Sequence, residues 1–247
     1  MSRYFCDLHI HSCLSPCADD DMTPGNIAGM ATINGLQIVA LTDHNTSKNC
    51  PAFFKQAQAF GLIPVPGMEL TTTEDIHVVC LFATLEDAMA FDAFVDEGRP
   101  HIKNETEFFG HQYLINEDDS IRGEEDYLLL HTSGISIEEA YAEVYRRGGA
   151  CFPAHVDRPS GGMIEVLGDV PPEPPFTAYE LRDGALRDDY TARYPTLAPL
   201  MHVVSSDAHR LTDIAEAVFS IEIADEPYSS KAVRAELIRM LREVPHG

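Results

Sequence analysis

Histidine and acidic side chains recur where short apolar segments of this 247-residue chain end. The set comprises His9, His11, His44, Glu69, His155, Asp207 and His209. Imidazole and carboxylate groups are the ligands that Zn²⁺, Mn²⁺ and Fe²⁺ favour in proteins. In His9-x-His11 the alternation of a strand places both imidazoles on one face. The residue types therefore predict metal chemistry, provided that the fold brings these side chains together.

An alternation of strands and helices is expected to do this. Runs rich in Val, Ile, Leu and Phe occur at 4–8, 36–42, 62–66, 76–83, 150–154, 177–181, 200–205 and 217–223, with helix-like segments between most of them. Thr23 and Ser136 are predicted N-caps of two crossover helices, and glycines follow both helical patterns. Because the carboxyl ends of parallel strands lie on one face of an α/β fold, loops distant in sequence converge there.

His77, in "DIHVVCLF", starts its strand instead of following it. It joins the cluster only if that strand runs against the others or if its entry loop folds inward. With His77 included, six histidines and two carboxylates are too many ligands for one ion. They suit two or three ions, with Glu69 bridging a pair of them.

Composition narrows the functional classes. The net charge of −23 disfavours nucleic acid and anionic membrane surfaces as partners. No apolar run approaches ~20 residues and the start lacks a signal-peptide pattern, so a cytoplasmic protein is expected. The six cysteines are predicted to be reduced. Cys13-x₃-Cys17 is similar to half of a zinc site, but without a second pair a structural or turn role is favoured.

Six ordered segments carry a family resemblance: "DLHIHS", "LTDHN", "PGMEL", "IHVV", "PAHVD" and "SSDAH". Their order and approximate spacing resemble those of the polymerase-and-histidinol-phosphatase (PHP) family of metal-dependent phosphoesterases. The resemblance implies an α/β fold, a distorted seven-stranded (β/α) barrel, with a multinuclear metal site at the carboxyl ends of the strands. We expect residues 1–247 to form a single PHP domain with an insertion at about 99–136.

The resemblance also implies three ligand sets for two or three divalent ions, Zn, Mn or Fe. They are His9, His11, Glu69 and Asp207; then Glu69, His77 and His155; then His44 and His209 with an acidic residue of the first loop. The family's common "SDG" after the "HxHS" segment is missing, and "SPCADDDMTP" stands in its place. Asp19 or Asp21 is expected to fill the acidic role.

The expected activity is hydrolysis of a small phosphate ester or nucleotide through a metal-bridged hydroxide, which such ions activate near neutral pH. Asp207 or His209 would relay a proton, and Arg158 and Lys48 are candidates to bind the substrate phosphate. The alternatives are an amidohydrolase-like hydrolase of a non-phosphate bond and a non-catalytic metal-binding regulatory module. No nucleic-acid partner is expected.

Overall fold

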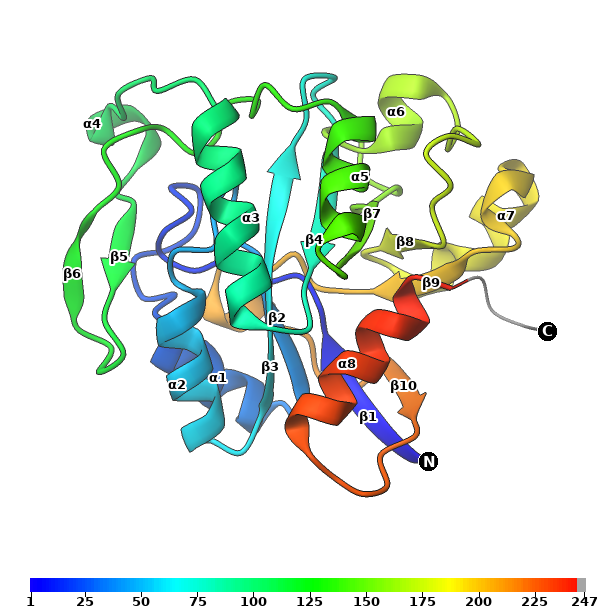
Figure 1. Ribbon diagram of the computed structural model, residues 1–247, viewed down its shortest axis with the longest axis horizontal. Coiled ribbons are helices and arrows are strands. Elements are labelled where there is room, and N and C mark those ends of the chain that lie inside the picture. Colours follow the sequence, from blue (N-terminus) through cyan, green and yellow to red (C-terminus); the bar gives the residue numbers. More distant parts are fainter. Residues whose placement is uncertain (244–247) are drawn as a thin grey trace.

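The computed structural model describes residues 1–243 as an α/β fold (Figure 1). The strands are β1 (Ser2–Asp7), β2 (Ile38–Leu41), β3 (Ile63–Thr71), β4 (His77–Leu81), β5 (Tyr113–Ile115), β6 (Ile121–Glu124), β7 (Ala150–Pro153), β8 (Ala178–Leu181), β9 (Met201–Val204) and β10 (Ser220–Ile223). The α-helices are α1 (Pro24–Ile33), α2 (Cys50–Ala59), α3 (Leu85–Gly98), α4 (Thr106–Phe109), α5 (Ile137–Arg146), α6 (Met163–Leu167), α7 (Arg187–Arg193) and α8 (Ser230–Leu241). Each of the eight predicted apolar runs overlaps one strand of the main sheet or of the β8–β9 pair.

The main sheet has the strand order β10-β1-β2-β3-β4-β7. Strands β1, β2 and β3 are parallel, whereas β10 pairs antiparallel to β1 and β4 pairs antiparallel to both β3 and β7. A separate parallel pair, β8–β9, follows on from β7. Among the described residues the ladders form this six-stranded sheet and two two-stranded sheets, β5–β6 and β8–β9. The mixed α/β fold is consistent with the barrel that the resemblance implies, but its count of seven strands is not confirmed.

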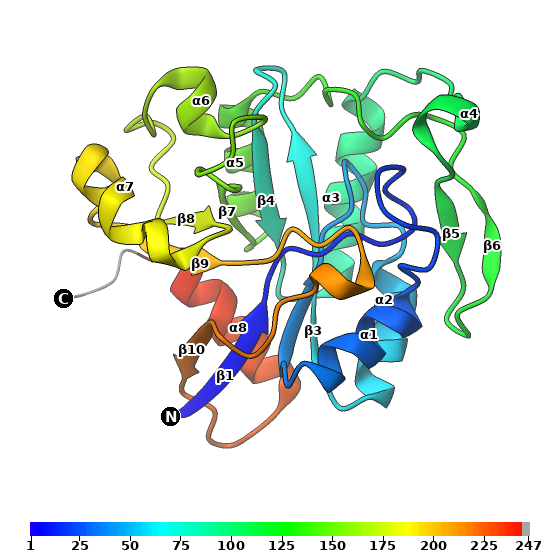
Figure 2. The same ribbon diagram turned by 180° about the vertical axis from the view of Figure 1, so that it is seen from behind.

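Helices α3, α5 and α8 lie over one side of the main sheet, while the loop that follows β1 crosses the other side (Figures 1 and 2). Every side chain of β2, β3, β7 and β8 is buried. Such runs stay apolar on both faces because helices and loops exclude water from both. Within residues 1–243 no helix combines the length and the apolar character needed to cross a membrane.

Local signals set the predicted crossover helices. Thr23 caps α1 by accepting the Asn26 N–H, Pro24 is its first residue, and Gly35 follows the helix at φ +78°. Ser136 caps α5 in a complete capping box with Glu139. These side chains satisfy backbone N–H groups that have no partner inside the helix, which confirms both helix starts.

The segment 99–136, proposed as an insertion, forms α4 and the β5–β6 hairpin. It is tied to the body of the fold by charged contacts. Glu125 accepts hydrogen bonds from Lys48 at 2.5 Å and from Arg99 at 3.1 Å. The side-chain oxygen of Asn49 accepts a hydrogen bond from the backbone N–H of Ile115 at 2.9 Å. The hairpin therefore packs beside the loop that carries His44.

Candidate metal centre

Strand direction brings the predicted site residues to one edge of the sheet. His9 and His11 follow β1, His44 follows β2, and Glu69 lies near the end of β3. Because β4 runs antiparallel to β3, its first residue, His77, lies at the same edge. The condition that the sequence placed on His77 is thus met by the direction of β4.

Glu69 lies at the centre of the cluster and is completely buried. Its two oxygens lie between 2.8 and 3.5 Å from nitrogens of five imidazoles: His9, His11, His44, His77 and His155. Each oxygen faces a different group of nitrogens: Oε1 faces His9, His77 and His155, and Oε2 faces His11 and His44.

Asp207 is the second carboxylate of the cluster. Its Oδ1 is 3.5 Å from His9 Nε2 and 3.3 Å from His11 Nε2, and His209 Nδ1 lies at 3.7 Å. Three groups of side chains have ligand atoms within 4.8 Å of one another and could each hold a metal ion. They are His9, His11, Glu69 and Asp207; His44, Glu69 and His77; and His11, His44 and His209.

Hydrogen bonds outside the cluster fix which nitrogens face inward. Ser15 Oγ donates to Asp43 at 2.8 Å, so it accepts from His11 Nδ1 at 3.0 Å. His11 Nε2 is then the lone-pair nitrogen that faces the site. Outer partners of this kind set the tautomer and the orientation of metal-binding histidines.

Glu180 does the same for His9, and the sequence analysis missed it. This fully buried carboxylate of β8 accepts the His9 Nδ1–H at 2.9 Å and the backbone N–H of His155 at 3.0 Å. The available signal was a charged residue inside the apolar run 177–181. A buried carboxylate there needs hydrogen-bond donors, which marks it as a candidate partner of the site.

Orphaned atoms show that the cluster fits metal ions. Among the described residues, His44 Nδ1, Glu69 Oε2 and Asp207 Oδ1 are buried without a hydrogen-bond partner. His44 Nδ1 and Glu69 Oε2 are only 2.9 Å apart, yet they lack hydrogen-bond geometry. Unpaired buried acceptors that face one another are costly, and a cation between them removes the cost.

The pKa values show the same demand for positive charge. Burial opposes protonation of His9 and His11, but the surrounding carboxylates outweigh it, so the pKa of His9 is raised well above its usual value and that of His11 to about 9. Burial would raise the pKa of Glu69, but His77, His9 and His44 hold it well below its usual range. The cluster therefore stabilises cations near its carboxylates.

His44 and His209 behave differently. Burial is the main cause that lowers the pKa of His44 to about 4 and that of His209 to about 3, and the nearby His11 adds to both effects. These two imidazoles are neutral at physiological pH, which is the form that binds a metal ion.

Residues with a strained, left-handed backbone also lie at or beside the metal-ligand cluster. Five residues other than glycine have positive φ among those described, and three of them are Asn45 at 52°, His155 at 27° and Asp207 at 52°. Asn45 follows His44 directly, so all three lie at or beside the cluster. Left-handed backbone costs free energy for residues with a Cβ, and the surrounding structure must hold it in place.

A cavity of about 410 Å³ opens above these ligands. Its lining comprises Cys17, His44, Thr71, His77, Leu130, Arg158 and His209. Arg158 Nη1 contacts Asp207 Oδ2 at 2.9 Å, and Arg182, which the sequence analysis did not single out, has its Nε 3.9 Å from the same oxygen. Two guanidinium groups therefore lie beside Asp207.

The structure does not bring every predicted residue to the cluster. Asp19 and Asp21 line a separate cavity with Gly110 and His111, and Asp19 Oδ2 is 3.6 Å from Arg210 Nε. Lys48 contacts Glu125 within the 99–136 segment instead of the cavity above the cluster. The first loop instead contributes Cys17 to that cavity.

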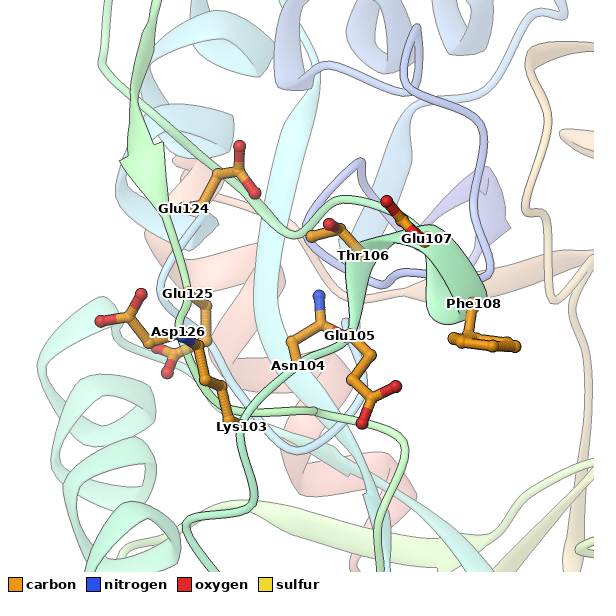
Figure 3. A pocket seen from close by; sticks show the side chains of 9 residues that line it. All are labelled: Lys103, Asn104, Glu105, Thr106, Glu107, Phe108, Glu124, Glu125 and Asp126. Carbon is orange, nitrogen blue, oxygen red and sulfur yellow. The ribbon is translucent and has the colours of Figure 1, made fainter.

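A further cavity of about 490 Å³ lies within the 99–136 segment. Its walls come from α4 and the residues before it on one side and from the end of β6 on the other (Figure 3). The lining comprises Lys103, Asn104, Glu105, Thr106, Glu107, Phe108, Glu124, Glu125 and Asp126, none of which belongs to the three ligand groups.

Comparison with known proteins identifies the family. A family model, the PHP domain, matches residues 7–155, which include His9, His11, His44, Glu69, His77 and His155. The chain belongs to the PHP domain family. Members of this family are metal-dependent hydrolases, and the ligand cluster of this PHP domain agrees with that class.

The similar proteins align with different fractions of this chain. An error-prone DNA polymerase from Symbiobacterium thermophilum is 34% identical over 77 residues, which are 31% of this chain and 7% of the polymerase. The lesion-specific endonuclease PfuEndoQ from Pyrococcus furiosus has a TM-score of 0.59 at 19% identity, over 94% of this chain and 56% of the endonuclease. A Bifidobacterium adolescentis protein assigned as a metal-dependent phosphoesterase has a TM-score of 0.56 at 19% identity, over 83% and 87% of the two chains. The chain thus spans only part of the polymerase and of the endonuclease.

The prediction that nucleic acid is not a partner is wrong. An endonuclease Q with the same fold (TM-score 0.55, 19% identity, over 85% of this chain and 50% of that chain) holds a 27-mer duplex with an abasic lesion at its active site, and the polymerase is a further DNA-processing relative. The prediction was wrong because it used the net charge of the whole chain to exclude nucleic acid. A charge of −23 is summed over the whole surface, whereas a substrate meets the field at the mouth of the site. There, the guanidinium groups of Arg158 and Arg182 lie beside Asp207.

Proposed function

We propose that this PHP domain is a phosphoesterase that hydrolyses phosphate monoesters, with nucleotides and phosphorylated nucleic-acid ends among its substrates. One observation carries the proposal: five imidazoles surround a single buried carboxylate, Glu69, beneath a cavity with Arg158 in its wall. A volume of about 410 Å³ accommodates a phosphoryl group with a nucleoside-sized substituent.

The ligand sets that we propose start from the three groups that the geometry provides. His155 adds to the second of them, since its Nε2 is 2.9 Å from Glu69 Oε1. When bound, divalent cations supply Lewis-acid activation of water and of the phosphoryl group. The chain's own contribution is to hold the ligand nitrogens in the correct tautomer, through Glu180 behind His9 and through Ser15 with Asp43 behind His11.

Arg158 is proposed to orient the substrate. A guanidinium has five N–H donors, so one contact with Asp207 leaves donors that can bind a phosphoryl oxygen. His209 lies beside Asp207 and is neutral near pH 7, because burial lowers its pKa to about 3. A neutral imidazole is the form that binds a metal ion, so His209 is proposed as a ligand in the group with His11 and His44.

The test is a substrate panel with protein loaded with zinc or manganese. The panel contains p-nitrophenyl phosphate, mononucleotides, oligonucleotides with a 5′ or 3′ phosphate, a duplex with an abasic site, and an amide substrate. Phosphate release and strand length on denaturing gels are measured for the parent, for Asp207→Asn and for Glu222→Gln, a surface control on β10.

We expect phosphate release by the parent and the control and its near-complete loss in Asp207→Asn. Internal strand cleavage without phosphate release would replace the proposal with endonuclease activity. Hydrolysis of the amide alone would assign amidohydrolase chemistry, and metal-loaded protein without turnover of any substrate would favour a binding module.

A further inference from the structure

The ligand group His11, His44 and His209 has no acidic member. Three imidazoles bring no negative charge, so they leave the full charge of a divalent cation uncompensated in a buried place, which is unfavourable unless an anionic ligand is near. Glu69 and Asp207 already serve the other ligand groups, in which they meet His9, His11 and His77. A further anionic side chain is therefore wanted on the open side of this trio.

The first loop, residues 12–22, is the segment that covers the trio. Ser15 Oγ accepts from His11 Nδ1 at 3.0 Å and from the His44 backbone N–H at 3.1 Å. Four residues later, the backbone N–H of Asp19 donates to the carbonyl oxygen of His209 at 2.9 Å. Cys17, whose side chain is exposed, lies midway between these two anchors and lines one cavity with His44 and His209.

Elimination within the loop leaves Cys17 as the ligand candidate. Ser12 and Ser15 donate their hydroxyl protons to Asp43. Cys13 is buried in an apolar cluster with Ala52 and Ile115. The loop's three aspartates, Asp19, Asp20 and Asp21, line the separate cavity beside Gly110 and His111.

Cys17 alone among the loop's residues lines the cavity above the cluster, together with His44 and His209. A second observation supports a ligand site here: the His44 side chain lines this cavity, is only 6% exposed, and has a buried Nδ1 without a hydrogen-bond partner among the described residues. We propose that Cys17 supplies a thiolate ligand to the metal ion held by His11, His44 and His209.

The chemistry of sulfur gives this assignment a consequence. Thiolate is a soft ligand that selects zinc over manganese or magnesium, whereas carboxylate ligands accept the harder ions. Binding of the ion displaces the thiol proton to solvent. As the side chains stand, Cys17 is outside the tight trio, so its thiol turns towards the histidines when the ion binds. The assignment makes this third position a zinc site.

Cobalt(II) is the probe that tests it, because thiolate-to-cobalt charge transfer absorbs in the near ultraviolet and imidazole or carboxylate ligands produce no such band. The inference rests on the metal centre of the proposed function, so metal content is measured beside the spectrum. Full-length protein is stripped with a chelator and titrated with Co²⁺ and, separately, with Zn²⁺. The variants are Cys17→Ser, Cys17→Asp and Cys13→Ala, the last being the matched control from the same loop.

We expect the band in the parent and in Cys13→Ala and its absence in Cys17→Ser. That variant should bind its weakest zinc at least about 10–100-fold less tightly, since this is the range for losing only an outer partner of a metal ligand. Cys17→Asp should restore the zinc count without the band. Cobalt bound by the parent without the band, or a band that survives in Cys17→Ser, would overturn the role of Cys17 and leave the proposed phosphoesterase intact. Protein that binds no metal would overturn both.

Discussion

Replacing Glu180 with Gln tests whether a buried carboxylate outside the ligand groups controls the metal centre. Glu180 is fully buried in β8 and accepts three contacts: His9 Nδ1 at 2.9 and 3.2 Å and the His155 backbone N–H at 3.0 Å. Glutamine keeps the size of the side chain, but its NH₂ group must face one of these N–H donors. The change also removes the negative charge that favours a cation next to His9.

Two independent arguments give the size of the expected loss of metal affinity in Glu180→Gln. Loss of an outer hydrogen-bond partner of a metal-binding histidine costs about 10–100-fold in metal affinity, or about 1.4–2.8 kcal/mol. A buried donor left without an acceptor costs about 1–3 kcal/mol, which is the same range. We therefore expect the affinity of the site that contains His9 to fall by one to two orders of magnitude, with a smaller loss of stability in the chelated protein.

The assay is competition with a chromophoric chelator, combined with thermal unfolding of the metal-free protein. Glu222→Gln is the matched control, because Glu222 is exposed on β10 and pairs with Arg3 at 3.4 Å. A Glu180→Gln protein that binds metal as tightly as this control would refute the reasoning that Glu180 orients His9. Equal destabilisation of apo and metal-loaded protein would show that Glu180 supports the fold and not the site.

Three further predictions address the cluster and its rim. Glu69→Gln should abolish most turnover and release metal while the far-ultraviolet circular dichroism spectrum stays unchanged; turnover within a few-fold of the parent would show that Glu69 does not bridge. Arg158→Ala should raise KM for a phosphorylated substrate while metal content stays constant, and Arg193→Ala, a surface control, should change neither. In chelated protein the free energy of unfolding should fall as the pH is lowered from about 6.5 towards 4. The pKa values of His44 and His209 are lowered to about 4 and 3 in the folded protein. The unfolded chain therefore takes up more protons than the folded chain in this pH window. His11, whose pKa is raised to about 9, stabilises the fold equally throughout that window, so His209→Asn should flatten the fall in urea titrations at a series of pH values.

The sequence by itself determined the strands of the main sheet and of the β8–β9 pair, the starts of two helices, and the residues at the strand ends. Apolar runs report local burial, and the caps at Thr23 and Ser136 act within four residues of the chain, so both can be inferred without tertiary structure. The motifs around His9, Glu69 and His155 also sufficed to suggest the family, because ligand residues must keep their order along the chain.

Tertiary structure alone decided which distant side chains meet. The direction of β4 places His77 beside Glu69, and the pairing of β8 with β9 beside β7 brings Glu180 within reach of His9. Neither contact has a periodic signal, because both depend on long-range strand pairing. The same applies to Lys48, which the sequence placed beside the substrate and the fold placed against Glu125. The prediction from net charge that nucleic acid is not a partner was wrong for a related reason. Net charge is a sum over the whole chain, whereas a substrate at the site responds to the few charges that the fold places around it.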